Sequence, residues 1–186
     1  MTGSAIRCLN SNLTLINSII TKNVALMEGV IALDGGSLNI DFSNIIDNKK
    51  GILMTNNPNE KGWVITNSII QNNGRDEFVY SIEPSISYCN TTTLLEGEGN
   101  ISTDPKFIDH NKGDWRLKPF SECIGAGKIT DVDYDKDGNP RPLPSGSNPD
   151  IRPLFLTSTS RRLMSFLTGK DIRRREVDVR NRGRIS

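Results

Sequence analysis

Three nearly identical seven-residue segments recur at nearly even spacing in the first half of the chain. They read NSIITKN at 17–23, SNIIDNK at 43–49 and NSIIQNN at 67–73. Aligned on their paired isoleucines, the segments lie 26 and then 24 residues apart. A repeat of this length is typical of a solenoid, in which each unit forms one turn and stacks on the next.

Each unit contains short alternating runs rather than a helical pattern. The runs LTLINS, SLNIDFSN and WVITNS precede the isoleucine pairs, a weaker copy reads SISYCN, and Gly, Asn, Asp and Pro separate the runs. Leucine-rich repeats have a similar length, but the units lack their leucine spacing. The sequence therefore predicts an all-β fold, a right-handed parallel β-helix of about three to four coils over residues 1–99.

Stacked coils place equivalent residues above one another. We expect both isoleucines of each pair to point inward, and Ile19, Ile45 and Ile69 to form one interior ladder. Each buried isoleucine would stabilise the fold by roughly 1.5–3 kcal/mol.

Asparagine recurs at the turn after each isoleucine pair. Asn tolerates a left-handed backbone, and its amide can bond to an Asn in the next coil. We expect a ladder of Asn23, Asn48 and either Asn72 or Asn73. The alternative is that Asn is simply a common loop residue in this chain.

Residues 100–151 are expected to form a C-terminal capping segment, because the end of a solenoid exposes unpaired strand edges and an open core. The segment has a denser apolar set than any coil, consisting of Phe107, Trp115, Leu117, Phe120 and Ile124. Its run GDWRLKP predicts one strand with Trp115 and Leu117 on the same face.

Two stretches resemble one group of β-helix proteins. GSAIRCLNSNLTLINSIITKN resembles the coils of large secreted bacterial right-handed β-helix proteins, described as polymorphic-outer-membrane-protein-like or choice-of-anchor proteins. STDPKFIDHNKGDWRLKPFSECIGAGK, followed by DVDYDKDGNPRP and PDI, resembles the end of such helices. The matching residues of this ending are Asp104, Pro105, Phe107, Gly113, Asp114, Arg116, Leu117, Ser121, Ile124, Ala126, Gly127, Asp135, Asp137, Gly138, Pro140, Arg141, Asp150 and Ile151. The resemblance covers about residues 3–151 and implies a secreted β-helix.

The chain departs from that group at both ends. The last motif of the group, D-I-G-A-Y-E, is replaced by DIRPLF, and GSAIRC resembles the middle of a coil with nothing before it. We expect the chain to be the last coils of a longer β-helix, with an uncapped N-terminal coil that is able to self-associate.

Residues 152–186 differ from the rest in charge. They contain ten Arg or Lys and three Asp or Glu, a net charge of +7, so the remainder carries −6 against the total of +1. We expect a loosely ordered basic tail outside the solenoid. It is either a basic arm for an acidic membrane, nucleic acid or polysaccharide, or an extension without such a role.

The acidic residues of the coils do not recur at one position of the repeat. They are Glu28, Asp34, Asp41, Asp47, Glu60, Asp76, Glu77, Glu83, Glu96 and Glu98. A β-helix hydrolase needs paired carboxylates, and a lyase needs an Arg or Lys base near carboxylates that hold Ca²⁺. We therefore predict no catalytic residue and no organic cofactor, and place the lone His110 in a surface turn.

Three cysteines, Cys8, Cys89 and Cys123, match no metal-ligand spacing. We expect buried thiols that fill small spaces. A disulfide between two of them is the alternative.

The stretch DVDYDKDG predicts a calcium site. Asp131, Asp133, Asp135 and Asp137 alternate before Gly138, and oxygen ligands in such numbers suit Ca²⁺. An EF-hand loop starting at Asp133 would need a Glu at its twelfth position, where this chain has Pro144. The alternative is an acidic surface loop that needs no metal.

Two classes of function remain. The first is a non-catalytic extracellular or cell-surface module, adhesin-like, that binds a polysaccharide or cell-surface component and no specific nucleic acid. The second is the C-terminal part of a polysaccharide lyase or glycoside hydrolase whose catalytic coils lie upstream. No stretch approaches the ~20 apolar residues of a membrane span, and no signal peptide is visible. We expect the parent protein to be extracellular or at the cell surface.

Overall fold

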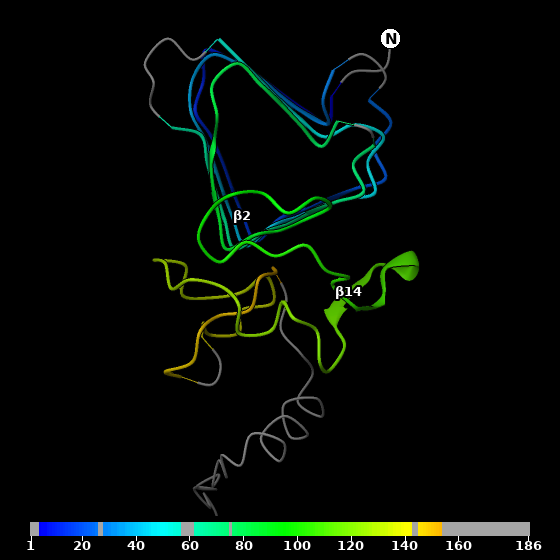
Figure 1. Ribbon diagram of the computed structural model, residues 1–186, viewed down its shortest axis with the longest axis vertical. Helices are drawn as coiled ribbons and strands as arrows, with labels where there is room; N and C mark the ends of the chain where they lie inside the picture. The colour runs from blue at the N-terminus through cyan, green and yellow to red at the C-terminus, as the bar shows by residue number, and fades with distance from the viewer. Residues whose placement is uncertain (1–3, 26–27, 57–61, 75, 143–144, 154–186) are drawn as a thin grey trace, which may run out of the picture. The chain divides into compact units, whose positions relative to one another are not determined.

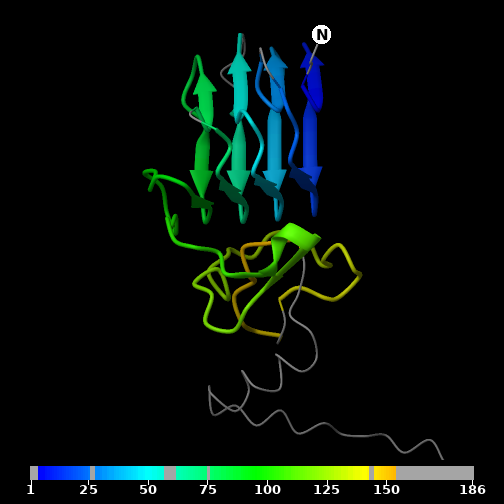
Figure 2. The same cartoon turned by 90° about the vertical axis from the view of Figure 1, so that its right-hand side faces the viewer.

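A computed structural model describes residues 4–25, 28–56, 62–74, 76–142 and 145–153, all within one compact unit. Its first part is a parallel β-solenoid (Figures 1 and 2). The solenoid has three parallel sheets, and each of them contains four strands, one from each level of the stack. The described residues contain no α-helix, so the predicted all-β solenoid is confirmed. The right-handed winding stays a prediction.

The three sheets run along the solenoid. Sheet A contains β1 (Ile6–Leu9), β4 (Ile31–Asp34), β7 (Ile52–Thr55) and β10 (Phe78–Tyr80). Sheet B contains β2 (Leu13–Ile16), β5 (Leu38–Asp41), β8 (Val64–Thr66) and β11 (Ser85–Ser87). Sheet C contains β3 (Ile19–Thr21), β6 (Asn44–Ile46), β9 (Ile69–Gln71) and β12 (Asn90–Thr91).

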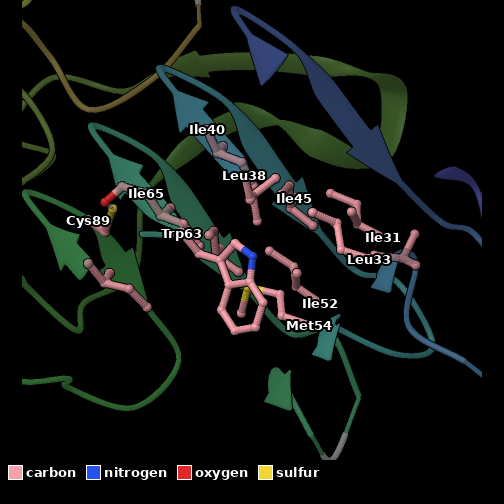
Figure 3. Close-up of a cluster of buried hydrophobic side chains, with 13 residues drawn as sticks. Ile31, Leu33, Leu38, Ile40, Ile45, Ile52, Met54, Trp63, Ile65 and Cys89 are labelled. Carbon is pink, nitrogen blue, oxygen red and sulfur yellow. Dashed lines mark hydrogen bonds between the residues drawn. The ribbon is translucent and has the colours of Figure 1, made fainter. Parts of the chain in front are cut away.

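The inward side chains of all three sheets form one apolar core (Figure 3). Ile31, Leu38, Ile45 and Ile65 come from different strands and are each at most 1% exposed. Alternation along each strand supplies this core, because every second side chain points inward.

Paired residues of β3, β6 and β9 lie 25 residues apart in the sequence. Ile20, Ile45 and Ile70 are paired partners and form the inner column. The expected ladder of Ile19, Ile45 and Ile69 is therefore wrong, because the middle isoleucine pair is shifted by one residue. A shift of one residue moves a strand side chain to the opposite face of the sheet.

The second column of sheet C faces outward, and this corrects the expectation that both isoleucines point inward. Ile19, Asn44 and Ile69 are partners in this column. Asn44 and Ile69 are fully buried, although they lie outside the inner core. The C-terminal segment covers this outer face, and Gln71 of the same strand donates its amide to the Thr103 carbonyl at 2.9 Å.

The asparagine ladder is confirmed for Asn23, Asn48 and Asn73. The Asn23 amide donates to Asn48 Oδ1 at 3.0 Å, and the Asn48 amide donates to Asn73 Oδ1 at 2.8 Å. Asn72 instead occupies a corner with a left-handed backbone, at φ 56°. Left-handed residues recur at the corners of the coil, and Asn, which tolerates this backbone, occupies several of them.

A serine ladder runs parallel to it. The Ser18 N–H donates to Ser43 Oγ at 3.1 Å, and the Ser43 N–H donates to Ser68 Oγ at 3.0 Å. Each hydroxyl also donates to the carbonyl two residues earlier. These bonds close the corner between sheets B and C in three successive coils.

The C-terminal segment begins with an antiparallel hairpin. It consists of β13 (Phe107–Asp109), the 3-10 turn η1 (His110–Lys112) and β14 (Asp114–Leu117). Trp115 and Leu117 are buried on one face, as predicted.

Residues 128–141 then run along the corner between sheets B and C. Lys128 and Asn67 exchange two hydrogen bonds, at 2.6 and 3.0 Å. Thr130 donates its hydroxyl to Asp41 Oδ2 at 2.8 Å. Residues 128–141 therefore pack along the side of the solenoid. They were expected, as part of the 100–151 cap, to cover its C-terminal end.

The same segment reaches the first coil. The Asn17 amide donates to the Tyr134 carbonyl at 2.8 Å, and Arg141 donates to Asn17 Oδ1 at 2.8 Å. The Arg141 guanidinium lies 3.8 Å from the ring centroid of Phe42. Residues from three successive coils thus contact one C-terminal segment.

The packed region extends past residue 151. Arg152 and Pro153 are buried, and Arg152 pairs with Asp150. The remainder of the expected basic tail, residues 154–186, lies outside the described residues.

Candidate functional site

An open recess lies between sheet C and the C-terminal hairpin. It has a volume of about 580 Å³. Its walls come from one corner of the solenoid and from the hairpin with its flanks, and consist of Ile46, Asp47, Gln71, Asn72, Asp104, Pro105, Lys106, Phe107, Ile108, Asp109, His110, Asn111 and Lys118. We call this recess the hairpin cleft.

The solenoid wall of the cleft is a corner that follows sheet C. Lys22, Asp47 and Asn72 occupy the same position in three coils, with φ of 58°, 57° and 56°. Asp47 and Asn72 line the cleft. Their spacing is fixed by strand pairing on one side of the corner and by the asparagine ladder on the other.

The opposite wall is the hairpin turn. Asp109 accepts from the Lys112 N–H at 3.3 Å and forms an ion pair with the Lys112 ammonium at 3.0 Å. Phe107 packs edge-to-face against Trp115, with centroids 5.2 Å apart. His110 is exposed and lies 6.2 Å from the Trp115 ring, in the turn where it was expected.

The cleft presents groups of both charges. The Asp104 carboxylate accepts from the Lys106 N–H at 2.8 Å, and the Lys106 ammonium donates to the Phe120 carbonyl at 3.1 Å. Gln71 is occupied, because its amide donates to Asn90 and Thr103. Within the described part of the chain, the side chains of Asp47 and Asn72 make no hydrogen bond and can still accept or donate one. Carboxylates, amides and ammonium groups around an open recess suit a ligand with many hydroxyl groups.

Comparison with protein-family models, with curated proteins and with solved structures finds no match for this chain. The fold alone classifies it. The chain is a parallel β-solenoid.

The four aspartates of the predicted calcium loop do not converge. Asp135 is buried, and its carboxylate accepts from the backbone N–H groups of Asp137 and Asn139, both at 2.8 Å. Asp131 and Asp133 are exposed. Within the described ranges, no three His, Cys, Asp or Glu side chains are grouped so that they could hold a metal. The calcium site stays a prediction, and the observed contacts give Asp135 a role in organising the loop.

The sequence analysis did not predict the structural role of two buried carboxylates, Asp41 and Asp150. Asp41 accepts from Thr66, Asn67 and Thr130, and so joins two coils to the C-terminal segment. Asp150 accepts from the Gly125 N–H at 2.8 Å and from Arg152 Nε at 3.0 Å. No local motif marks Asp41, because its partners are distant in the sequence. Asp150 belongs to the PDI motif, but the motif does not show that its carboxylate is buried.

Two arginines of the C-terminal segment also have structural partners. Arg116 pairs with Asp114, and this pair holds the pKa of the Asp114 carboxyl below its ordinary value. Burial lowers the pKa of Arg141 to about 10, which leaves it cationic at neutral pH beside Phe42. The Arg141 contacts position the segment on the solenoid, whereas the Asp114–Arg116 pair lies within β14.

A smaller recess, of about 200 Å³, lies on sheet A. Glu28, Lys50 and Asp76 line it together with glycines and apolar side chains. Glu28 pairs with Arg7 at 3.3 Å. The sequence analysis did not predict that Glu28, Lys50 and Asp76 lie close together. The reason is that successive strands of sheet A are separated by different numbers of residues.

All three cysteines are free thiols. Cys89 and Cys123 are buried, as expected, whereas Cys8 is only half-buried. Burial raises the pKa of Cys89 to about 12 and that of Cys123 to about 11. Both thiols therefore stay protonated and unreactive at neutral pH. In the part of the chain that the structure describes, no helix is long and apolar enough to cross a membrane.

Proposed function

We propose that this chain is a non-catalytic extracellular or cell-surface module that binds a polysaccharide in the hairpin cleft. The observation that carries the proposal is the cleft itself, which has a volume of about 580 Å³ and carries carboxylate, amide and ammonium groups on two rigid walls. Strand pairing holds one wall and a hairpin holds the other, so a ligand meets a preformed surface.

The contacts of the acidic side chains support binding over catalysis. Asp104 and Asp109 line the cleft, but each caps a neighbouring backbone N–H. Glycoside hydrolysis uses two carboxyl groups that face one bond. In this cleft, two of the three carboxylates already serve local turns.

The proposed location outside the cell rests on the resemblance to secreted β-helix proteins. The C-terminal motifs that carry this resemblance form the hairpin and the segment on the solenoid corner. A solenoid supported by such a segment suits a module that presents binding loops at a distance from its attachment point.

A titration with soluble glycans tests the proposal. The purified full chain is titrated by calorimetry with oligosaccharides from pectin, alginate, chondroitin and a neutral glucan. We expect at least one to bind, and the double variant Asp47→Ala with Asn72→Ala to weaken that binding at least tenfold. Asn39→Ala, on the exposed face of β5, is the control and should bind as the unchanged chain does.

Two outcomes would contradict the proposal. One is that no glycan binds, or that the double variant binds as tightly as Asn39→Ala. The other is release of reducing or unsaturated sugar ends by the purified chain, which would assign it to the carbohydrate-active enzymes instead.

A further inference from the structure

At the last level of the solenoid, the edges of two sheets are covered. In sheet C, Ile101 pairs with Asn90, and the Ile101 N–H donates to the Cys89 carbonyl at 2.8 Å. In sheet B, the Tyr88 N–H donates to the Glu98 carbonyl at 2.7 Å, and the Asn100 amide donates to the Ile86 carbonyl at 2.9 Å. The segment that follows β12 therefore replaces a missing strand on both edges.

The edge of sheet A is different. β10 is the terminal strand of its sheet, and β7 is its neighbour. The Ile52 N–H donates to the Glu77 carbonyl at 2.9 Å, and the Ser81 N–H donates to the Met54 carbonyl at 3.1 Å. Along a strand, the N–H and C=O groups of successive residues point alternately to the two neighbouring sides. The peptide groups of Phe78 and Tyr80 therefore face away from β7, where the described residues add no further strand.

This open edge borders a recess of about 510 Å³. One part of its wall is apolar and includes Phe78, Tyr80, Ile86, Leu94 and Leu95. Tyr80 is 45% exposed and Leu94 is 63% exposed. We call this recess the β10 groove.

The polar part of the wall is acidic. Asp76, Glu77, Glu83 and Glu96 line the groove, and no Lys or Arg is among its lining residues in the described ranges. Glu77 accepts from the Thr92 N–H at 3.0 Å and from the Thr92 hydroxyl at 2.7 Å. These bonds fix the 92–96 segment opposite β10 and keep the groove open.

We propose that the β10 groove binds an extended basic peptide segment of a partner protein, which adds a strand to sheet A. An exposed strand edge is a template for such pairing, and side-chain pockets select the peptide. Alternating apolar and basic side chains match the apolar and acidic parts of the wall. Two β10 grooves of different copies do not fit each other, because they would bring like charges together.

The test uses a fluorescein-labelled, end-capped peptide of alternating lysine and valine and the full chain. Fluorescence anisotropy should show saturable binding that weakens with added salt. We expect a peptide of alternating glutamate and valine to bind at least tenfold more weakly. A lysine–valine peptide with N-methylated amides on its pairing edge should also bind at least tenfold more weakly, because it cannot form the strand bonds.

Two protein variants complete the experiment. Glu83→Gln with Glu96→Gln removes two exposed groove carboxylates and should weaken binding about tenfold. Glu122→Gln with Asp131→Asn makes the same change in net charge on exposed residues outside the groove, and should have little effect. The proposal is overturned if the two variants bind alike, if N-methylation has no effect, or if sedimentation shows that a dimer of this chain already covers the edge.

Discussion

At the scale of single residues, Asn44 is a polar side chain between two isoleucines in the outer column of sheet C. It is fully buried between Ile19 and Ile69, and among the described residues neither of its amide atoms has a hydrogen-bond partner. An unsatisfied buried polar group costs about 1–3 kcal/mol. We therefore expect Asn44→Ile to raise the free energy of unfolding by about that amount, measured by urea denaturation.

Asn73→Ile is the control for this prediction. Asn73 is also fully buried, but its side chain bonds to Asn48 and to the Ile45 carbonyl. The same substitution there should lower stability. If both variants are destabilised alike, the column does not accept an isoleucine at position 44.

The ion pair of Asp150 and Arg152 gives a second residue-scale prediction. Arg152 is fully buried. Arg152→Met leaves the Asp150 carboxylate buried beside an apolar side chain, which we expect to cost about 3–5 kcal/mol of unfolding free energy. The double variant Asp150→Asn with Arg152→Met should recover part of this loss, and an equal or larger loss would contradict a direct pairing role.

At the scale of strands and coils, the asparagine ladder connects three levels. Asn48 donates to Asn73 and to two carbonyls, and accepts from the Asn23 backbone and side chain. Asn48→Ala leaves several buried groups without partners, so we expect a loss of about 2–3 kcal/mol in urea denaturation. Asn23→Ala, at the end of the ladder, should cost less, and the reverse order would show that the ladder does not join the coils.

The repeat shows how much of the fold the sequence carries. Strand alternation and the Gly- and Asn-rich turns predicted the solenoid correctly, because both are local signals. The isoleucine pairs gave the wrong register, since Ile is accepted on the inner face and on the covered outer face. Ser18, Ser43 and Ser68 are each 25 residues apart and give the right one. The hydroxyls of Ser43 and Ser68 each accept a bond from the preceding coil at one corner, so a serine cannot shift by one residue as an isoleucine can.

The cleft and the edge groove were not predictable in the same way. The hairpin cleft joins Asp47 to residues near Asp109, and the corner contacts join Asn17 to Arg141. Such pairs depend on the path of the C-terminal segment through space. The motif residues of that segment predicted its strand with Trp115 and Leu117, but not the face of the solenoid on which it lies.

At the scale of the whole molecule, the buried thiols couple stability to alkaline pH. Burial raises the pKa of Cys89 to about 12 and of Cys123 to about 11, whereas an unfolded cysteine titrates near 8.5. The stabilising contribution is complete below the unfolded pKa and is lost as pH rises above it. Between about pH 8.5 and pH 10, we expect the unfolding free energy to fall with a slope that rises from about 0.7 to about 1.4 kcal/mol per pH unit for each thiol.

The measurement is urea denaturation at several pH values in that window. Cys89→Ala with Cys123→Ala should show a flatter dependence on pH than the unchanged chain. A thiol reagent at pH 8 gives an independent readout, since both cysteines should react only after unfolding. Identical pH profiles for the two proteins would contradict the buried, protonated state.

The contacts of residues 128–141 also limit how the gene can change in length. Tandem duplication of the 25 codons of the first coil adds one complete coil without disturbing the ladders, because the first two coils pair at a spacing of 25 residues in all three sheets. If that coil were inserted between Asn17 and Asn67, one of these residues would move by about 4.8 Å relative to the other. The bonds to Tyr134, Arg141 and Lys128 could then no longer all form. Natural length variants of this chain should therefore keep an unchanged coil count between Asn17 and Asn67.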